Sequence, residues 1–286
     1  MEYLAHLIQH EVDLQHWKGI KTSRDGPTFI HLFIADDLIL FAKVSKRNST
    51  TIKNTLEKFC FVSGQKINFS KSRIFFSPHT SPSKISQVEN DLCISSCRDF
   101  GKYLGVPIIT DQRSSRAYNF LINKLRSMLA NSLSLAGRMI LINSVIPTHV
   151  MQCHLLPAKI CNVMDKLNRN FLWGNSSTKK KLHLLKWQTV TKPKLLGGLG
   201  IKESGHRNKV LLAKRVWDLR ENSNSLHACL FSSKYPPNSS QSKCRSTSWS
   251  SLCKAKTLCD KGTRWLICNG TQIKFWLDNW TGFGPL

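Results

Sequence analysis

Apolar and polar residues follow each other along this chain with periods that predict both helices and short strands. Near the start, Leu4, Leu7 and Ile8 recur at helical spacing and predict a short opening helix. A second helix is predicted from about Asn48, which suits an N-cap, to Gly64, which suits a C-cap. Its apolar face comprises Ile52, Leu56, Phe59 and Cys60.

Two apolar runs, 29–34 and 38–41, are rich in β-branched and aromatic residues and predict two strands. Asp36 and Asp37 lie between them, where short polar side chains favour a tight turn. Further expected elements are strands at 66–69 and 72–76, a helix at 83–92 and an extended segment at 103–109.

The second half of the chain has a helical pattern from 115 to 173, which Pro147 and Pro157 divide into separate helices. The remaining expectations are a helix at about 208–219, a flexible connector at 222–251 that contains 11 serines, and a hairpin turn at Asn269 and Gly270. These elements predict an α+β protein, and 286 residues suffice for one large domain or two smaller ones.

The charge of the chain indicates the class of partner. Lys and Arg number 42 against 17 Asp and Glu, a net charge of +25. The segment 112–217 holds 19 Lys and Arg but only two acids, Asp165 and Glu203, and therefore carries +17 of this charge. Such an excess favours a polyanionic partner, most simply nucleic acid, over a uniformly solvated basic surface.

The pair Asp36 and Asp37 is the strongest candidate for chemistry. Two adjacent carboxylates repel each other unless a cation neutralises them. Hard oxygen ligands suit Mg²⁺, which typically uses one or two protein carboxylates and completes its shell with water or substrate phosphates. For the pair alone, a solvated turn with two charged tips remains the alternative.

The ten cysteines and the apolar runs exclude several classes of protein. The cysteine spacings are irregular and provide no second Cys/His pair at zinc-finger spacing, so we interpret them as reduced thiols without a metal. No run approaches the ~18 apolar residues of a membrane span. We expect an intracellular protein, nuclear or cytoplasmic, without a membrane partner.

The hairpin segment resembles the Ala-Asp-Asp hairpin of reverse transcriptases, in the form carried by plant LINE-like (non-LTR) retrotransposons. Ile34 stands where that family usually has an aromatic residue. The resemblance continues in the family's order through Met1–Ile8, Trp17–Ile20, Ser63–Ser72, Lys102–Pro107, Phe171–Gly174, Gly197–Ile201, Asn208–Lys214 and Phe275–Trp280.

The resemblance implies an RNA-directed DNA polymerase that uses Mg²⁺, an RNA template, a DNA primer and deoxynucleoside triphosphates. Asp36 and Asp37 match the family's catalytic metal ligands, and Asp36 is the better match. The family has a further aspartate upstream, and we expect this chain to lack it. The implied parts are the C-terminal portion of a right-hand palm at 1–110, a helical thumb-like region at 111–175, and at 176–286 a small irregular C-terminal segment. This last part would be a basic linker leading toward an absent zinc-binding or RNase H-like module.

The resemblance also places candidate nucleic-acid contacts. Lys66 and Lys71 match a motif near the active site, where a lysine can bind the incoming triphosphate or protonate the departing pyrophosphate. Two solvated lysines beside a strand are an equally weighted alternative. The other candidate contacts are Arg113, Arg116, Lys124, Arg126, Arg138, Lys179, Lys180 and Lys181. Two hypotheses remain open: a polymerase piece that acts with a partner chain, and a non-catalytic nucleic-acid-binding relic.

Overall fold

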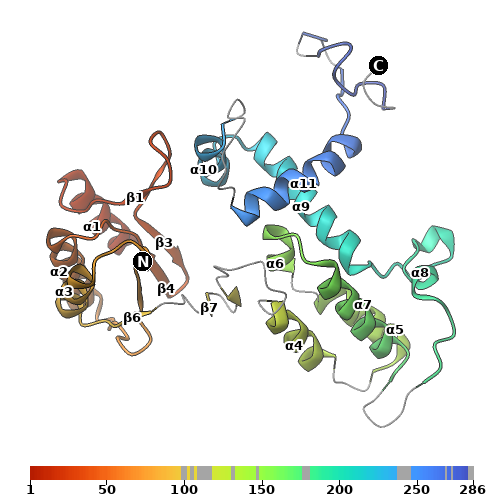
Figure 1. Cartoon of the computed structure of the whole chain (residues 1–286), viewed down its shortest axis with the longest axis horizontal. Helices are drawn as coiled ribbons and strands as arrows, with labels where there is room; N and C mark the ends of the chain where they lie inside the picture. The colour runs from red at the N-terminus through yellow and green to blue at the C-terminus, as the bar shows by residue number, and fades with distance from the viewer. Residues whose placement is uncertain are drawn as a thin grey trace. The chain divides into compact units, whose positions relative to one another are not determined.

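The computed structural model describes residues 1–97, 102–103, 106–107, 118–129, 133–145, 148–175, 181–236, 246–267, 269–271 and 273–282. The chain forms two compact units, which are described separately. Unit 1 comprises Met1–Thr110 and Leu226–Ser240, and unit 2 comprises Asp111–Ser225 and Gln241–Leu286. Figure 1 shows helices in both units and short strands in unit 1, which confirms the α+β prediction. The palm-and-thumb arrangement stays a prediction.

Unit 1 combines helices with two-stranded sheets. Its helices are α1 (Glu2–Asp13), α2 (Lys46–Ser63), α3 (Pro82–Leu92) and α10 (Leu226–Lys234). Its antiparallel pairs are β1 (Ile20–Lys21) with β2 (Thr28–Phe29), β3 (His31–Ile34) with β4 (Asp37–Leu40), and β7 (Lys102–Tyr103) with β8 (Val106–Pro107). A parallel pair joins β5 (Ile74–Phe75) to β6 (Ser96–Cys97).

The core of unit 1 forms where α1 and α2 pack together. It consists of Leu4, Ile8, Trp17, Ile52 and Phe59, which are all buried. Leu4 and Ile8 are four residues apart and Ile52 and Phe59 are seven apart, which places each pair on one face of its helix. Apolar side chains from both strands of the β3–β4 hairpin also pack against this core.

A buried asparagine joins the hairpin to α2. The Asn48 side chain, 3% exposed, accepts a hydrogen bond from Lys18 N at 3.0 Å. It donates to the carbonyl oxygens of Lys43 at 2.6 Å and Lys18 at 3.3 Å. Nearby, the indole of Trp17 donates to the Phe41 carbonyl at 3.0 Å. These bonds satisfy the polar groups of the chain as it leaves β4 and enters α2, so the hairpin has a defined base.

Unit 2 is built of helices. They are α4 (Asn119–Met128), α5 (Leu135–Val145), α6 (Thr148–Cys153), α7 (Ala158–Leu172), α8 (Trp187–Val190), the 3-10 helix η2 (Lys194–Leu196), α9 (Ser204–Glu221) and α11 (Thr247–Gly262). The long helix α9 packs against α6, α7 and α11 (Figure 1). A second core cluster includes Ile142, Phe171, Leu172, Val190 and Ile201.

A second buried asparagine organises unit 2. Asn208 of α9, 1% exposed, accepts from Leu156 N at 2.8 Å. Its amide donates to the carbonyls of Met151 at 2.7 Å and His154 at 2.9 Å. The connection between α6 and α7 is therefore fixed by α9, a helix about fifty residues later in the chain.

Three predicted elements differ in the structure. The strand expected at 66–69 is wrong, because the Asn68 side chain accepts from Lys71 N at 3.1 Å and forms a turn instead. The helix α2 begins earlier than predicted, and its cap is Ser45, whose Oγ accepts from Asn48 N at 3.2 Å. At Gly270 the described neighbours form a turn without paired strands.

The flexible connector predicted at 222–251 is wrong for its described helical parts, while residues 237–245 lie outside the described residues. This segment contains α10 and the first residues of α11. Ala228 and Phe231 are buried and anchor α10. Serines occur within both helices because their hydroxyl groups donate to backbone carbonyls of the preceding turn. Ser232 of α10 donates to the Cys229 carbonyl, and Ser251 of α11 donates to the Thr247 carbonyl.

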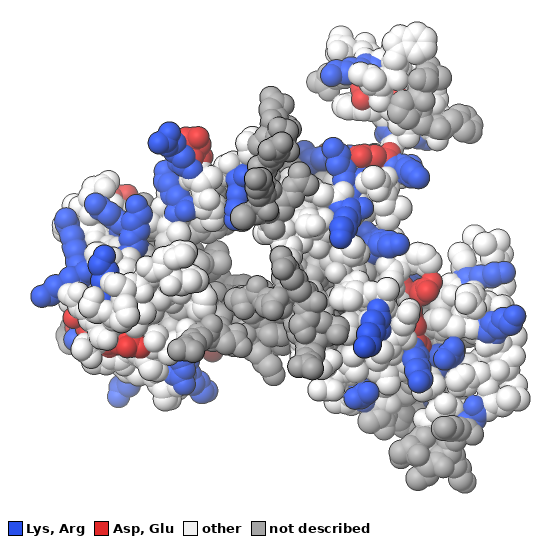
Figure 2. Space-filling view, viewed as in Figure 1, with Lys and Arg blue, Asp and Glu red and all other residues white. Residues whose placement is uncertain are grey.

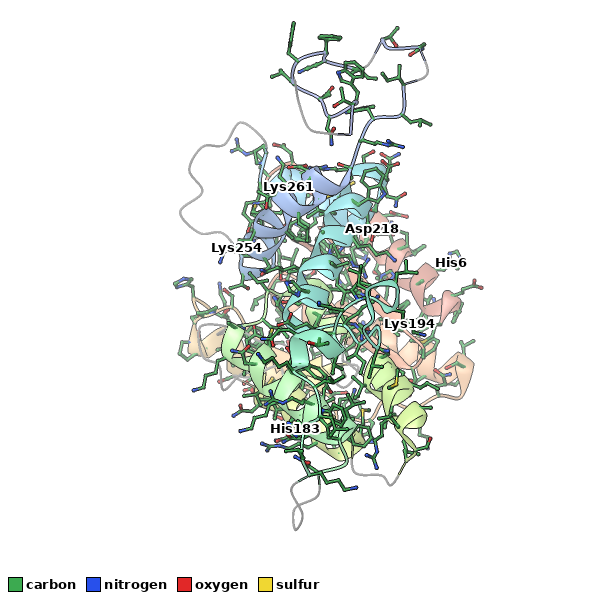
Figure 3. The ribbon with its side chains drawn as sticks, turned by 90° about the vertical axis from the view of Figure 1, so that its right-hand side faces the viewer. His6, His183, Lys194, Asp218, Lys254 and Lys261 are labelled. Carbon is green, nitrogen blue, oxygen red and sulfur yellow. The ribbon has the colours of Figure 1, made fainter. Side chains whose placement is uncertain are left out.

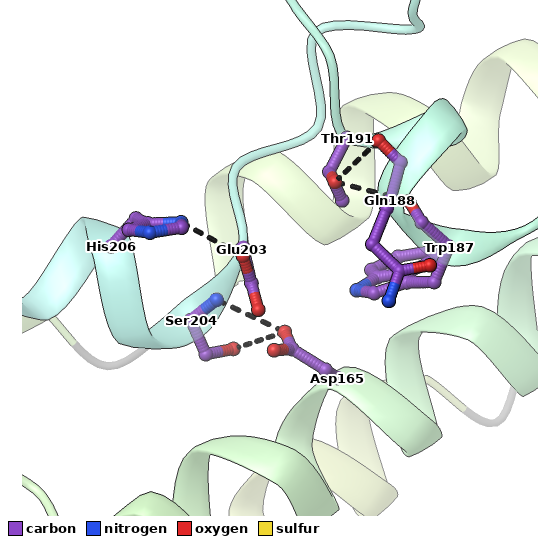
Figure 4. Close-up of polar contacts among 7 residues, drawn as sticks. All are labelled: Asp165, Trp187, Gln188, Thr191, Glu203, Ser204 and His206. Atoms are coloured by element: carbon purple, nitrogen blue, oxygen red, sulfur yellow. Dashed lines mark hydrogen bonds and ion pairs between the residues drawn. The ribbon is translucent and has the colours of Figure 1, made fainter.

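A buried carboxylate links α7 to the start of α9. Asp165, 7% exposed, accepts from Ser204 N at 3.0 Å and from Ser204 Oγ at 2.7 Å (Figure 4). Glu203 and His206 form an ion pair of 2.8 Å beside it. Burial raises the pKa of Asp165, and the Ser204 hydrogen bonds oppose that effect. The group therefore joins two helices, but its ionised form is disfavoured there.

The stability of Asp165→Asn relative to the wild type should increase as the pH rises. The pKa of Asp165 is higher in the folded state than in the unfolded state, where it is about 3.9. Below the unfolded pKa the carboxyl group is protonated in both states and its contribution to stability is fully present. That contribution is lost as the pH rises through the folded pKa. The amide oxygen of the variant can still accept from Ser204, but it does not titrate. Urea unfolding between pH 4 and 7 should show the variant gaining on the order of 1 kcal/mol relative to the wild type. Glu57→Gln, which removes an exposed charge of unit 1, is the control, and a gain that shrinks with pH would contradict the expectation.

Candidate functional site

The two adjacent carboxylates occupy the tip of the β3–β4 hairpin. The register pairs His31 with Leu40 and Ile34 with Asp37, which leaves Ala35 and Asp36 as a two-residue turn. Asp36 and Asp37 are both exposed. The predicted hairpin with its Asp-Asp tip is therefore present.

The two faces of this hairpin have different surroundings. Phe33 and Leu38 form a cross-strand pair that packs against the core of unit 1. On the opposite face Leu32 is 38% exposed and Ile34 is 46% exposed. Asp37 is paired with Ile34 and belongs to this open face because side chains alternate along a strand. One face of the hairpin is thus packed on the core, while Asp37 lies on the solvent-exposed face and Asp36 is exposed in the turn.

The tip carries backbone strain. Ala35 has φ 53°, in the left-handed region that a residue with a Cβ rarely adopts. Two-residue hairpin turns require positive φ at their first position, which is why glycine, asparagine and aspartate are usual there. An alanine in this region costs about 1–2 kcal/mol. Strain of this kind concentrates at functional sites, and here it lies directly before Asp36.

The donor set at the tip suits one hard cation better than two. Carboxylates are preferred ligands of Mg²⁺, which needs only one or two from the protein. Among the described residues, no group of three or more His, Cys, Asp or Glu side chains lies close enough to hold a metal ion. Asp36 and Asp37 are therefore a partial ligand set within the described part of the chain.

Sequence reasoning did not single out His31, which lies on the core-facing side at the open end of the hairpin. Its ring stacks on Phe33 with centroids 4.4 Å apart. Burial lowers the pKa of His31, so the neutral imidazole is favoured. Because His31 faces away from Asp37, its position is that of a packing residue.

Lys71 lies in the turn that follows Asn68, Lys66 lies in the irregular segment before it, and both lysines are exposed. The ion pairs found between described residues do not join either lysine to Asp36 or Asp37. Their predicted role at a triphosphate stays a prediction.

Basic side chains are widespread on the visible face in Figure 2, and acidic ones are fewer. In unit 2, Lys124 and Arg126 lie on the exposed side of α4, opposite the buried Leu121 and Leu125. Lys181 is also exposed. Arg113, Arg116, Lys179 and Lys180 lie outside the described residues.

Arg138 was predicted to contact phosphate, but the structure gives its guanidinium local partners. It donates to the Leu172 carbonyl at 3.3 Å and lies over the Phe171 ring, 5.9 Å from the centroid. Its side chain therefore helps to pack α5 against α7.

Comparison with known proteins gives two matches. The sequence is 33% identical over 196 residues to the putative ribonuclease H protein At1g65750 of Arabidopsis thaliana, a match that covers 63% of this chain and 32% of that protein. It is 30% identical over 141 residues to the uncharacterized mitochondrial protein AtMg00310 of the same plant, covering 47% of this chain and 92% of that protein.

The chain belongs to the family of AtMg00310. No protein-family model matches the sequence. The chain spans about a third of the length of the ribonuclease H protein, so the activity in that protein's name can lie outside the shared region. Within the described part of the chain, no helix is both long and apolar enough to cross a membrane.

Replacing Ala35 by glycine tests the strained tip. Glycine should remove about 1–2 kcal/mol of strain and cost about 0.5–1 kcal/mol in backbone entropy, a net stabilisation of between about 0 and 1.5 kcal/mol. Ala35→Val should destabilise unit 1, because a β-branched residue tolerates positive φ least. Urea unfolding followed by circular dichroism measures both effects.

The matched control is Ala5→Gly inside α1, where glycine should cost about 1 kcal/mol. If Ala35→Gly destabilised unit 1 as much as Ala5→Gly, the tip would not be strained in solution.

Proposed function

We propose that this chain is part of a reverse transcriptase of a LINE-like retroelement, an RNA-directed DNA polymerase. The observation that carries the proposal is the hairpin with two adjacent exposed carboxylates at a strained tip. Its supporting face is packed on α1 and α2, which suits a site that must hold ligands in a constant position. The net charge of +25 is consistent with a template and a primer as partners.

In this proposal Asp36 and Asp37 bind Mg²⁺, with Asp36 as the principal ligand. When bound, the ion would activate the primer 3′-hydroxyl and stabilise charge on the transferred phosphate of a deoxynucleoside triphosphate. Asp36 belongs to the two-residue turn and Asp37 to the first position of β4, and both carboxylates are exposed. The remaining ligands would come from a segment other than the described residues.

A non-catalytic nucleic-acid-binding protein is the second candidate. It is favoured by the concentration of charge in the segment 112–217. Exposed lysines in the described part of this segment include Lys181, Lys186, Lys192 and Lys194 around α8 and η2. Lysine contacts to phosphate provide affinity without reading sequence, so this function needs no intact metal site.

The isolated chain should not extend an oligo(dT) primer on poly(rA) with Mg²⁺ or Mn²⁺. Two-metal catalysis holds its ions about 3.5–4 Å apart, which two carboxylates alone do not achieve. Incorporation of labelled dTTP measures the activity. If the wild type extended the primer and Asp36→Asn did not, the chain would be an active polymerase, and the expectation that its metal site is incomplete would be wrong.

Metal binding at the tip is testable without turnover. Mn²⁺ should broaden the backbone amide signals of residues 35–38 in the wild type when deoxynucleotide is present, and Asp36→Asn/Asp37→Asn should abolish the effect. Glu57→Gln/Asp13→Asn removes two exposed carboxylates elsewhere in unit 1 and is the matched control. The proposed metal role would be wrong if the control variant also abolished the broadening of residues 35–38, or if Mn²⁺ did not broaden these signals in the wild type.

Binding of single-stranded RNA should depend steeply on salt. Each neutralised phosphate contributes about −0.7 to the slope of log affinity against log salt on single strands. Lys186→Ala/Lys192→Ala/Lys194→Ala should flatten the slope by about two if all three contact phosphate. Fluorescence anisotropy at several salt concentrations gives the slope.

A control triple variant replaces Lys254, Lys256 and Lys261, which are exposed on α11 (Lys254, Lys261 and Lys194 are labelled in Figure 3). The charge change is the same in both variants. If both variants flattened the salt slope equally, RNA affinity would depend on the net charge of the chain rather than on contacts around α8 and η2.

A further inference from the structure

Unit 1 contains an open cavity away from the carboxylate tip. Its volume is about 460 Å³, and it is lined by His16, Lys46, Arg47, Thr50 and Thr51. These residues come from two elements: His16 follows α1, and the other four belong to the first turns of α2. The strand β4 leads from the hairpin tip toward α2, so the cavity lies beyond the end of the hairpin opposite to Asp36.

The side chains that line the cavity favour an anion. Lys46 and Arg47 carry fixed positive charges, and His16 contributes an imidazole. The Nδ1 atom of His16 is 3.0 Å from Glu11 Oε2, a contact that orients the ring. No acidic residue is among the cavity-lining residues. Arginine and lysine are donors typical of phosphate recognition. The Thr50 hydroxyl is engaged, because it donates to the Lys46 carbonyl at 3.0 Å.

The two cations occupy positions that are unfavourable for the helix by itself. The first turn of α2 contains Lys46 and Arg47 and no acid. Cations near a helix N-terminus oppose the macrodipole, whereas an anion there is stabilised. The geometry of α2 thus retains an unfavourable charge arrangement that a bound anion would offset.

The first turn of α2 has a side-chain cap and N–H groups without helical acceptors. Ser45 caps Asn48 N through Oγ and accepts from Ser49 N through its carbonyl. Lys46 and Arg47 are the first two helical residues, and their N–H groups have no acceptor within a helix. These N–H groups lie at the N-terminal end of the same helix whose first turns contribute Lys46 and Arg47 to the cavity lining.

We propose that this cavity binds a phosphate group. The observations that carry the proposal are the cavity itself, the cations contributed by α2 together with His16 from a separate segment, and the lack of an acid in its lining. Because the cavity is open, a phosphate that is part of a larger molecule can enter it. The shared chemistry is that of a polynucleotide phosphodiester and of a mononucleotide phosphate. The proposal does not depend on metal binding at Asp36 or Asp37.

The wall that carries these groups is fixed by buried contacts. Asn48 binds the backbone of Lys18 and Lys43, and the Ser49 hydroxyl, 2% exposed, donates to Asp91 Oδ2 at 2.5 Å. Both residues belong to the same helical turn as Arg47. The helical backbone that carries Lys46 and Arg47 is therefore held in place before an anion binds.

The test follows the backbone amide signals of residues 45–51 in the isotopically labelled full chain. Three probes are titrated separately: inorganic phosphate, dTTP without metal, and an oligo(dT) that has no terminal phosphate. We expect saturable shifts of these signals with at least one probe. Lys46→Ala/Arg47→Ala should weaken that binding about tenfold or more. Lys46→Gln/Arg47→Gln, which retains side-chain length and helix propensity, should do the same.

The matched control is Lys53→Ala/Lys58→Ala, which removes two exposed cations from the same helix outside the cavity. It should keep affinity within about twofold. Binding of oligo(dT) alone would identify a polynucleotide backbone, and binding of dTTP or phosphate alone a mononucleotide. Equal losses in the Lys46/Arg47 and Lys53/Lys58 variants, or no saturable shift at residues 45–51 with any probe, would overturn the proposal.

Discussion

The buried amide of Asn48 is the contact on which the functional geometry of unit 1 depends. One side chain satisfies the backbone of Lys18 and Lys43 while it forms part of the first turn of α2. An apolar residue of the same size would remove the partner of the Lys18 N–H and of the Lys43 carbonyl, while the Lys18 carbonyl would still accept from Lys43 N at 2.8 Å. A polar group left without a partner costs about 1–3 kcal/mol when it is buried. The base of the hairpin and the wall of the cavity meet at this amide, so both candidate sites share one support.

Unit 2 uses the same physical solution with different residues. Asn208 binds the backbone between α6 and α7, and Asp165 binds the first residue of α9. These bonds make α9 the element that organises its neighbours. The apolar stripes of the helices are turned inward, so their lysines and arginines remain on the surface. The excess of basic residues comes from the sequence, and the packing of the amphipathic helices places it on the surface.

Unit 1 separates two kinds of chemistry along one hairpin. Carboxylates suited to a cation lie at the tip, and cationic groups suited to phosphate lie beyond the opposite end. Placing them apart avoids mutual neutralisation, which would weaken both sites. In the proposed polymerase the two sites would contact different parts of a nucleic-acid substrate. In a non-catalytic nucleic-acid-binding protein the phosphate site would keep its purpose without the metal.

Local patterns in the sequence determined the hairpin, its carboxylate tip, the amphipathic helices and the excess of positive charge. Each depends on residues close together in the chain: alternation around Asp36, or apolar positions such as Leu121 and Leu125 one turn apart. Tertiary structure decided what local patterns do not encode. Asn48 reads as a cap but is a buried link to Lys18, thirty residues earlier, and the serine-rich segment around Phe231 is helical because its apolar residues are buried. Likewise the cavity joins His16 to Arg47, because hydrogen bonds and burial between distant segments depend on the folded chain rather than on spacing.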